Sequence, residues 1–66
     1  MATAAAYSGL GALLKLKGEF SEAENWYRKA LAIRERELGT DAEPTKLVRE
    51  RLGELLNEIW AGKNNE

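Results

Sequence analysis

Apolar residues recur every three or four positions in three stretches of the chain, and this spacing predicts three amphipathic helices. The first stretch covers residues 3–17, and a glycine, Gly18, follows it. The residues that share one face of this stretch are Tyr7, Leu10, Gly11 and Leu14. Because glycine tolerates positive φ at a helix end, we expect the first helix to end at Gly18.

The second stretch runs over residues 21–38 and carries its own start and stop signals. Ser21 and Glu24 have the spacing of a capping box, in which each side chain accepts from the other residue's backbone N–H. The residues that then share one helix face are Ala23, Tyr27, Ala30, Leu31, Arg34 and Leu38. Gly39 supplies the stop, so the pattern predicts a helix over about residues 21–38.

The third stretch follows a loop at residues 40–44. Thr45 is the expected helix cap, and the helix is expected to extend over about residues 45–61. Its apolar stripe is Val48, Leu52, Leu55, Leu56 and Ile59, with Trp60 beside it. No segment alternates in the two-residue rhythm of a half-buried strand. The sequence therefore predicts a single all-α domain of three antiparallel helices.

Length and composition narrow how such a domain can be stabilised. A chain of 66 residues buries only about 60% of the surface that it exposes when unfolded, so its core is small. The sequence has no cysteine and no histidine, which excludes disulfides and the common zinc sites. Self-association is the remaining way to bury more apolar surface.

The charge balance gives no electrostatic reason to bind a polyanion. The net charge is −1, and ten basic and eleven acidic residues are interleaved. We therefore expect no nucleic-acid and no membrane partner. The apolar N-terminus lacks the basic leading segment of a signal peptide, since its first basic residue is Lys15. No stretch is long enough to span a bilayer, and the absence of cysteine fits the cytoplasm.

Candidate catalytic chemistry is sparse. The single aspartate, Asp41, lies in the expected loop, where it is a turn former. The glutamates at helix-surface spacings are Glu22, Glu24, Glu50, Glu54 and Glu58. General acid–base catalysis needs a carboxylate in a pocket that shifts its pKa, and three short helices offer little pocket volume. The sequence predicts no enzyme, no metal site and no cofactor.

One internal repeat is visible. Leu10-Gly11-x-x-Leu14 recurs about forty residues later as Leu52-Gly53-x-x-Leu56. Small residues such as Gly11 and Ala30 mark positions where two helix backbones approach closely, since a larger side chain would separate them.

At these positions the chain resembles the tetratricopeptide repeat. The matching residues are Tyr7, Leu10, Gly11, Leu14, Gly18, Phe20, Ala23, Tyr27 and Ala30. Glu35 stands where the family has a closing proline, and the longer second helix with its Asp- and Pro-containing loop is similar to the repeats of kinesin light chains. The resemblance covers about residues 4–60, or one and a half repeats. Apolar residues at such spacing also occur in any three-helix bundle, which is the alternative reading.

The resemblance implies a concave groove that holds an extended peptide or a helix. The side chains that it places in the groove are Ser8, Ala12, Lys15 and Leu16 from the first helix, and Glu50, Glu54, Asn57 and Glu58 from the third. The family's clamp for a C-terminal carboxylate needs Lys, Arg and Asn, of which only Lys15 and Asn57 are present. The glutamates favour a basic or neutral partner.

Several large apolar residues exceed what three helices can bury. The self-association candidates are Trp26, Ile33, Leu47, Trp60 and Leu13, with Leu16 and Leu55 also in surplus. The two tryptophans either anchor an interface or cap the small core. We expect a protein-interaction scaffold that forms a homodimer or a higher assembly. The Gly39–Pro44 loop could act as a hinge for exchanging the third helix between chains.

Two other interpretations remain open. The chain could be a monomeric adaptor that binds a peptide in the groove. A small helical enzyme subunit is the third possibility, and no residue supports it. An isolated unit of one and a half repeats also suggests an excised or engineered piece, because such arrays normally stack at least three repeats.

Overall fold

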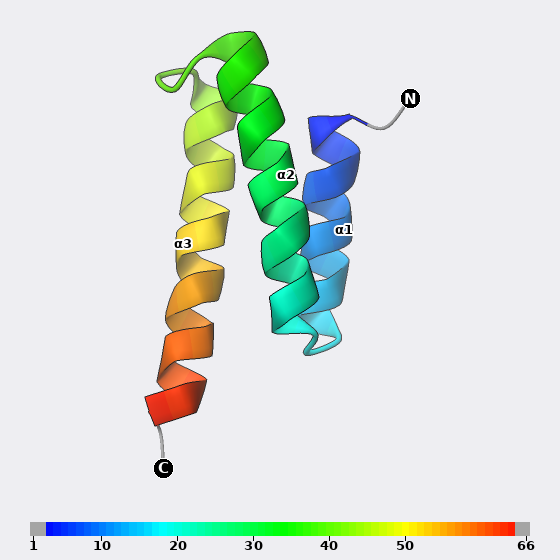
Figure 1. The fold of residues 1–66 in the computed structure, drawn as a ribbon, viewed down its shortest axis with the longest axis vertical. Coiled ribbons are helices and arrows are strands. Elements are labelled where there is room, and N and C mark those ends of the chain that lie inside the picture. Colours follow the sequence, from blue (N-terminus) through cyan, green and yellow to red (C-terminus); the bar gives the residue numbers. More distant parts are fainter. Residues whose placement is uncertain (1–2, 65–66) are drawn as a thin grey trace.

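Three helices make up the chain in the computed structural model, which describes residues 3–64. They are α1 (Ala4–Leu16), α2 (Phe20–Leu38) and α3 (Glu43–Asn64), and no strand occurs among the described residues. α2 lies between the other two helices and packs against both, whereas α1 and α3 contact each other little (Figure 1). The all-α fold is therefore as predicted. No described helix is both long and apolar enough to cross a membrane.

α1 has clear local signals at both ends. The Thr3 side chain accepts a hydrogen bond from the backbone N–H of Ala6 at 3.2 Å and so caps the first turn. At the other end Gly18 has φ +83°. The N–H of Gly18 donates to the carbonyl of Lys15, and the N–H of Glu19 donates to that of Leu14. This is the Schellman arrangement, and it turns the chain directly into α2.

The start of α2 differs from the predicted capping box. The helix begins at Phe20, Glu19 is its N-cap residue, and no side chain caps it. Ser21 therefore lies within the first turn. Glu24 instead accepts a 2.9 Å hydrogen bond from Arg28, four residues on, which is the favourable order for a helical ion pair. The capping-box prediction is wrong because the Gly18 turn is tight enough for the helix to begin one residue earlier.

α3 also begins earlier than predicted, at Glu43, so Thr45 lies inside the helix and does not cap it. The carbonyl of Ala42 accepts the hydrogen bond from the Lys46 N–H that opens the helix. Pro44 occupies the first turn, where a missing N–H costs nothing. The side chain of Thr45 is completely buried, which explains why it is unavailable as a cap.

The α2–α3 loop is held by one side chain from α3. Gly39 ends α2 with φ +90° and ψ 163°, a conformation that is essentially restricted to glycine. Arg49 donates a 3.1 Å hydrogen bond to the carbonyl of Thr40 and lies 3.7 Å from the carboxylate of Glu35. Arg49, which stands where the resembling family has an aromatic residue, therefore ties the loop to both helices.

The core is small and is centred on α2. Its fully or nearly buried apolar residues are Ala4, Ala23, Tyr27, Ala30, Val48, Leu52 and Leu55. Leu55 was expected among the surplus apolar residues, but it is completely buried. Conversely, three residues of the predicted stripes have exposed side chains, namely Leu10, Leu38 and Leu56. A layer of three helices encloses only the faces on either side of its central helix, so the outer helices keep apolar surface exposed.

The closest helix contact lies at Gly11. A Cβ atom added there would lie 3.1 Å from the ring of Tyr27 and 3.2 Å from the carbonyl oxygen of Ala23. A Cβ added at Gly53 would meet nothing within 4 Å. The prediction of close backbone approach is thus confirmed at Gly11, where α2 packs on α1, whereas the equivalent face of α3 has no helix against it.

Candidate functional site

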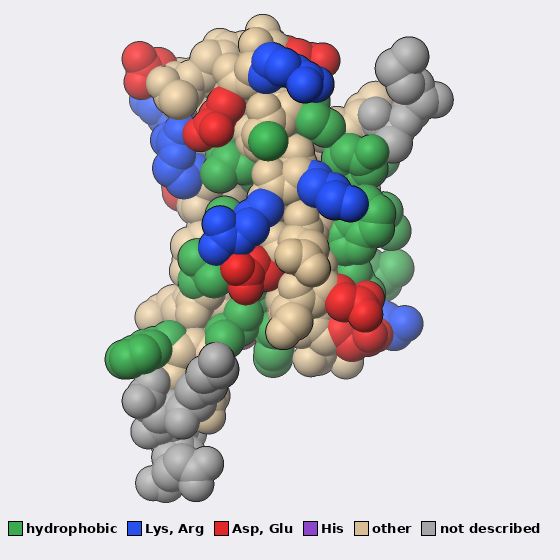
Figure 2. Space-filling model, viewed as in Figure 1, with side chains coloured by type: hydrophobic (Ala, Val, Ile, Leu, Met, Phe, Trp, Pro, Cys, Tyr) green, Lys and Arg blue, Asp and Glu red, His purple; other side chains and the backbone are tan. Residues whose placement is uncertain are grey.

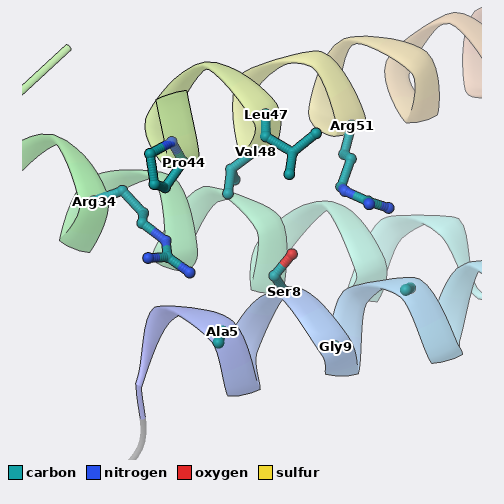
Figure 3. A pocket seen from close by; sticks show the side chains of 9 residues that line it. Ala5, Ser8, Gly9, Arg34, Pro44, Leu47, Val48 and Arg51 are labelled. Carbon is teal, nitrogen blue, oxygen red and sulfur yellow. The ribbon is translucent and has the colours of Figure 1, made fainter. Parts of the chain in front are cut away.

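A groove runs between α1 and α3 over the C-terminal part of α2, where Arg34 lies. It holds a cavity of about 310 Å³, which is in the range of ligand pockets. The lining residues are Ala5, Ser8, Gly9 and Ala12 from α1, Arg34 from α2, and Pro44, Leu47, Val48 and Arg51 from α3 (Figure 3). We refer to these nine residues as the groove. Because α1 and α3 barely contact each other, the groove is open to solvent along its length.

The predicted groove residues divide into three groups. Ser8 and Ala12 line the groove. Lys15 and Glu58 pair with each other across the gap between α1 and α3. The remaining four do not line it: Leu16, Glu50, Glu54 and Asn57.

Two of these four residues, Leu16 and Glu50, lie on other surfaces of the molecule. Leu16 is 85% exposed. Glu50 lines a neighbouring depression of about 320 Å³ together with Glu43, Pro44 and Leu47.

The charge of the groove is opposite to the expectation. Two arginines, Arg34 and Arg51, line it, and no carboxylate of the described residues does. On α3 the groove-facing positions are Pro44, Leu47, Val48 and Arg51, at spacings of three and four, so Glu50 lies to one side. The spacing of three and four residues can be read from the sequence. The glutamates of α3 were nevertheless expected in the groove, because they stand at the positions where the family has its groove residues.

Neither groove arginine has a carboxylate partner among residues 3–64. The Nε atom of Arg34 is buried and makes no hydrogen bond there. By contrast, four other basic side chains of the described chain form ion pairs, namely Lys15, Lys17, Arg28 and Arg49. Burying a nitrogen of a charged group without a hydrogen-bond partner costs folding free energy. The arginine pair, Arg34 and Arg51, is therefore the most distinctive polar feature of the groove.

The Lys15–Glu58 ion pair lies outside the groove and connects α1 to α3. The Lys15 Nζ atom lies 3.1 Å from the Glu58 carboxylate, and both side chains are partly exposed. The hydrogen bond to Glu58, and then the negative charge of that carboxylate, raise the pKa of Lys15 above its usual value of 10.5. The stabilisation from this pair is therefore fully present below pH 10.5 and is lost as the pH rises through the folded-state pKa.

We expect the Glu58→Gln substitution to lower the pKa of Lys15 toward 10.5, because it removes the charge and weakens the hydrogen bond. The measurement is a ¹³Cε NMR titration of the lysines up to about pH 12. Equal Lys15 midpoints in the two proteins would show that the ion pair does not form in solution.

A second feature is the apolar outer side of α1. Three leucines at spacings of three expose 40%, 55% and 85% of their surface: Leu10, Leu13 and Leu16. With the exposed Ala6 they form what we call the α1 outer face. Figure 2 shows hydrophobic side chains gathered along the edge of the molecule where α1 lies. The only charged residue within α1, Lys15, points toward α3 and leaves this face uncharged.

The predicted self-association residues do not form one patch. Leu13 lies on the α1 outer face, and Leu47 lines the groove. Ile33 is half-buried against the core residues Ala4, Ala30 and Val48. Trp60 is 66% exposed near the C-terminal end of α3. These candidates therefore belong to different surfaces of the molecule.

Trp26 is half-buried and lies between two neighbours. Its ring centroid lies 5.3 Å from that of Tyr7, with the planes tilted by 38°. The Lys29 ammonium lies 4.7 Å from the same ring, a cation–π distance. Trp26 of α2 therefore packs on Tyr7 of α1 and belongs to the α1–α2 contact.

A family model described as Tetratricopeptide repeat matches residues 3–41, which contain α1, α2 and the turn between them. No curated protein and no solved structure matches the chain.

Proposed function

Because the chain belongs to the tetratricopeptide repeat family, we propose that it is a protein-interaction scaffold which self-associates as a symmetric homodimer through the α1 outer face. Repeats of this family typically bind proteins and are not enzymes, and this role fits a small helical layer with a peptide-sized groove and an exposed apolar edge. The observation that carries the dimer proposal is the uncharged row of exposed leucines on α1.

We further propose that α1 and α2 form one repeat and that α3 is the first helix of a second. Leu52, Gly53 and Leu56 repeat the α1 pattern, which supports this assignment. The family model ends at Asp41, before α3 begins. α2 continues past Glu35, where the resembling family has its proline, to Leu38, as in the longer repeat subtype.

The α1 outer face is suited to a second copy of itself. A twofold symmetric interface brings each residue near its own equivalents, so like charges on such a face would repel. The α1 outer face carries no charge, and the small Ala6 leaves room for a second helix to approach.

The expected affinity is moderate. The three leucines together expose nearly the surface of two complete leucine side chains. Burying that surface on both copies gains about 5–11 kcal/mol, while association costs about 4–15 kcal/mol. Because the two terms are of similar size, we expect a concentration-dependent monomer–dimer equilibrium and not a permanent dimer.

We expect Leu13→Glu to abolish dimerisation, because it places two like charges on the symmetric interface and removes apolar contact. The measurement is sedimentation equilibrium from about 10 to 500 µM, a range that covers micromolar dissociation constants. Leu38→Glu is the matched control, since Leu38 is 50% exposed on α2, far from α1's outer face, and Leu13 is 55% exposed.

The helix content of both variants should equal that of the wild type by circular dichroism. A wild-type chain that stays monomeric at the highest concentration would refute the dimer. An equal loss of association in the Leu38→Glu variant would instead refute the α1 outer face as its location.

A monomeric, peptide-binding adaptor is the second candidate function. The observation that favours it is the pair of groove arginines without a carboxylate partner in the described chain, because they leave the groove able to bind an anion. The two functions use different surfaces of α1, so a single molecule could have both.

A further inference from the structure

We propose that the groove binds an extended acidic segment of a partner protein, with carboxylate side chains paired to Arg34 and Arg51 and an apolar side chain between them. This inference rests on the proposed role as a protein-interaction module, but it does not depend on dimerisation. It names the chemistry of the ligand, which the family alone leaves open.

The first argument is charge. Arg34 and Arg51 line a cavity without any lining carboxylate, and neither forms an ion pair within residues 3–64. The buried Nε of Arg34 lacks a hydrogen-bond partner in that range. The guanidinium groups of Arg34 and Arg51, which line the cavity, are of the kind that binds carboxylates through charge-assisted, often bidentate hydrogen bonds.

The second argument is geometry. Figure 3 shows the Arg34 and Arg51 side chains extending from α2 and α3 into the space that faces α1. Leu47 and Val48 lie between them along α3, and Ser8 faces them from α1. An apolar side chain of the ligand can therefore pack on Leu47, which is 50% exposed, while carboxylates on either side reach the two guanidinium groups.

The third argument limits the ligand to a short segment. Glu43 and Glu50 line the depression that adjoins the groove at Pro44 and Leu47. The Lys15 charge is already matched by Glu58. The positive charge is thus confined to two side chains, and a long polyanion such as nucleic acid would meet carboxylates beside them. A few acidic residues of an extended peptide fit this distribution.

The test is binding of a fluorescein-labelled peptide, Gly-Asp-Glu-Leu-Glu-Asp-Gly with both ends blocked, to the full 66-residue chain, followed by fluorescence anisotropy at about 50 mM salt. We expect binding that weakens as salt increases. Replacing the four acidic residues by Asn and Gln should reduce affinity at least about tenfold, since hydrogen bonds to charged groups are lost. Arg51→Gln, at an exposed position, should have a similar effect, and Arg34→Gln should add to it.

Arg36→Gln is the matched control, because Arg36 lies in the same helix as Arg34, is exposed and does not line the groove. It should leave binding unchanged. The proposal would be overturned if the peptide with Asn and Gln in place of its acidic residues bound as tightly as the acidic peptide. Equal losses of affinity in the Arg36→Gln and Arg51→Gln variants would also overturn it. Binding only to a version with a free C-terminus would also overturn it, in favour of a terminal carboxylate.

Sedimentation of the same samples keeps this proposal separate from the dimer. A monomer that binds the acidic peptide would support the groove assignment and refute self-association. A dimer that binds neither the acidic peptide nor its Asn/Gln version would support self-association and refute the groove assignment.

Discussion

Gly11→Val should destabilise the protein by about 1–3 kcal/mol, the usual cost of forcing extra carbon atoms into a packed core. The new Cβ alone would lie 3.1 Å from the Tyr27 ring and 3.2 Å from the Ala23 carbonyl oxygen. Neither can move easily, because Tyr27 is almost completely buried and the other atom belongs to the backbone of α2. The α1–α2 crossing must therefore widen. Thermal unfolding should show a fall in the melting temperature of about 4–8 °C per kcal/mol for a domain of this size.

Gly53→Val provides the matched control for that measurement. Gly53 occupies the same place in the repeated Leu-Gly pattern, but a Cβ there meets nothing within 4 Å. Valine has a slightly higher helix propensity than glycine, so stability should change by no more than about 0.5 kcal/mol. Similar losses in both variants would mean that Gly53 is also covered by a helix in solution, as it would be if a partner packed on α3.

The fold follows from local features of the sequence to a large extent. Spacings of three and four residues gave three helices, and Gly18 and Gly39 ended the first two as expected, both with positive φ. The exact start of a helix was harder to predict. At Ser21 and Thr45 the residue type favoured a cap, but a tight glycine turn and the first-turn Pro44 let α2 and α3 begin earlier. The capping propensity of a residue predicts the first residue of a helix poorly where the geometry of the preceding turn fixes that residue.

The chemistry of the groove was less accessible from the sequence. Ser8 and Ala12 line the groove because they lie on the α1 face next to the Gly11 contact. Arg34 was expected on the core stripe of α2, and only the three-dimensional arrangement shows that its long side chain passes from that stripe into the groove. Arginine commonly behaves in this way, with its aliphatic part buried and its charged end elsewhere. Helical periodicity gives the side of a helix but not the reach of the side chain.

Which surplus leucines would be buried was also beyond the sequence pattern. Leu55 and Leu16 are both leucines in amphipathic helices, yet Leu55 is completely buried and Leu16 is 85% exposed. The difference arises because α3 lies against α2 on the side that bears Leu55, whereas α1 has no helix on its outer side. Burial depends on the number of neighbouring helices, which periodicity within one helix does not report.

Leu55→Ala should therefore cost about 2–5 kcal/mol, the range for truncating a fully buried leucine. Leu55 packs with Ala23, Tyr27 and Leu52 at the centre of the α2–α3 contact, and three helices have no spare side chain to fill the cavity. A chain of 66 residues has a total stability of roughly 3–10 kcal/mol. The variant should consequently lose most of its stability, with α3 detaching from α2, and urea unfolding followed by circular dichroism would measure the loss.

Leu16→Ala separates this core effect from the surface effect. The same atoms are removed, but from a side chain that is 85% exposed, so the unfolding free energy of the monomer should change by less than about 0.5 kcal/mol. Because Leu16 belongs to the α1 outer face, self-association should weaken nonetheless. If Leu16→Ala instead destabilised the chain as much as Leu55→Ala at concentrations where only monomer is present, the outer side of α1 would have to be covered within the monomer, and the apolar surface on which the dimer proposal depends would not exist.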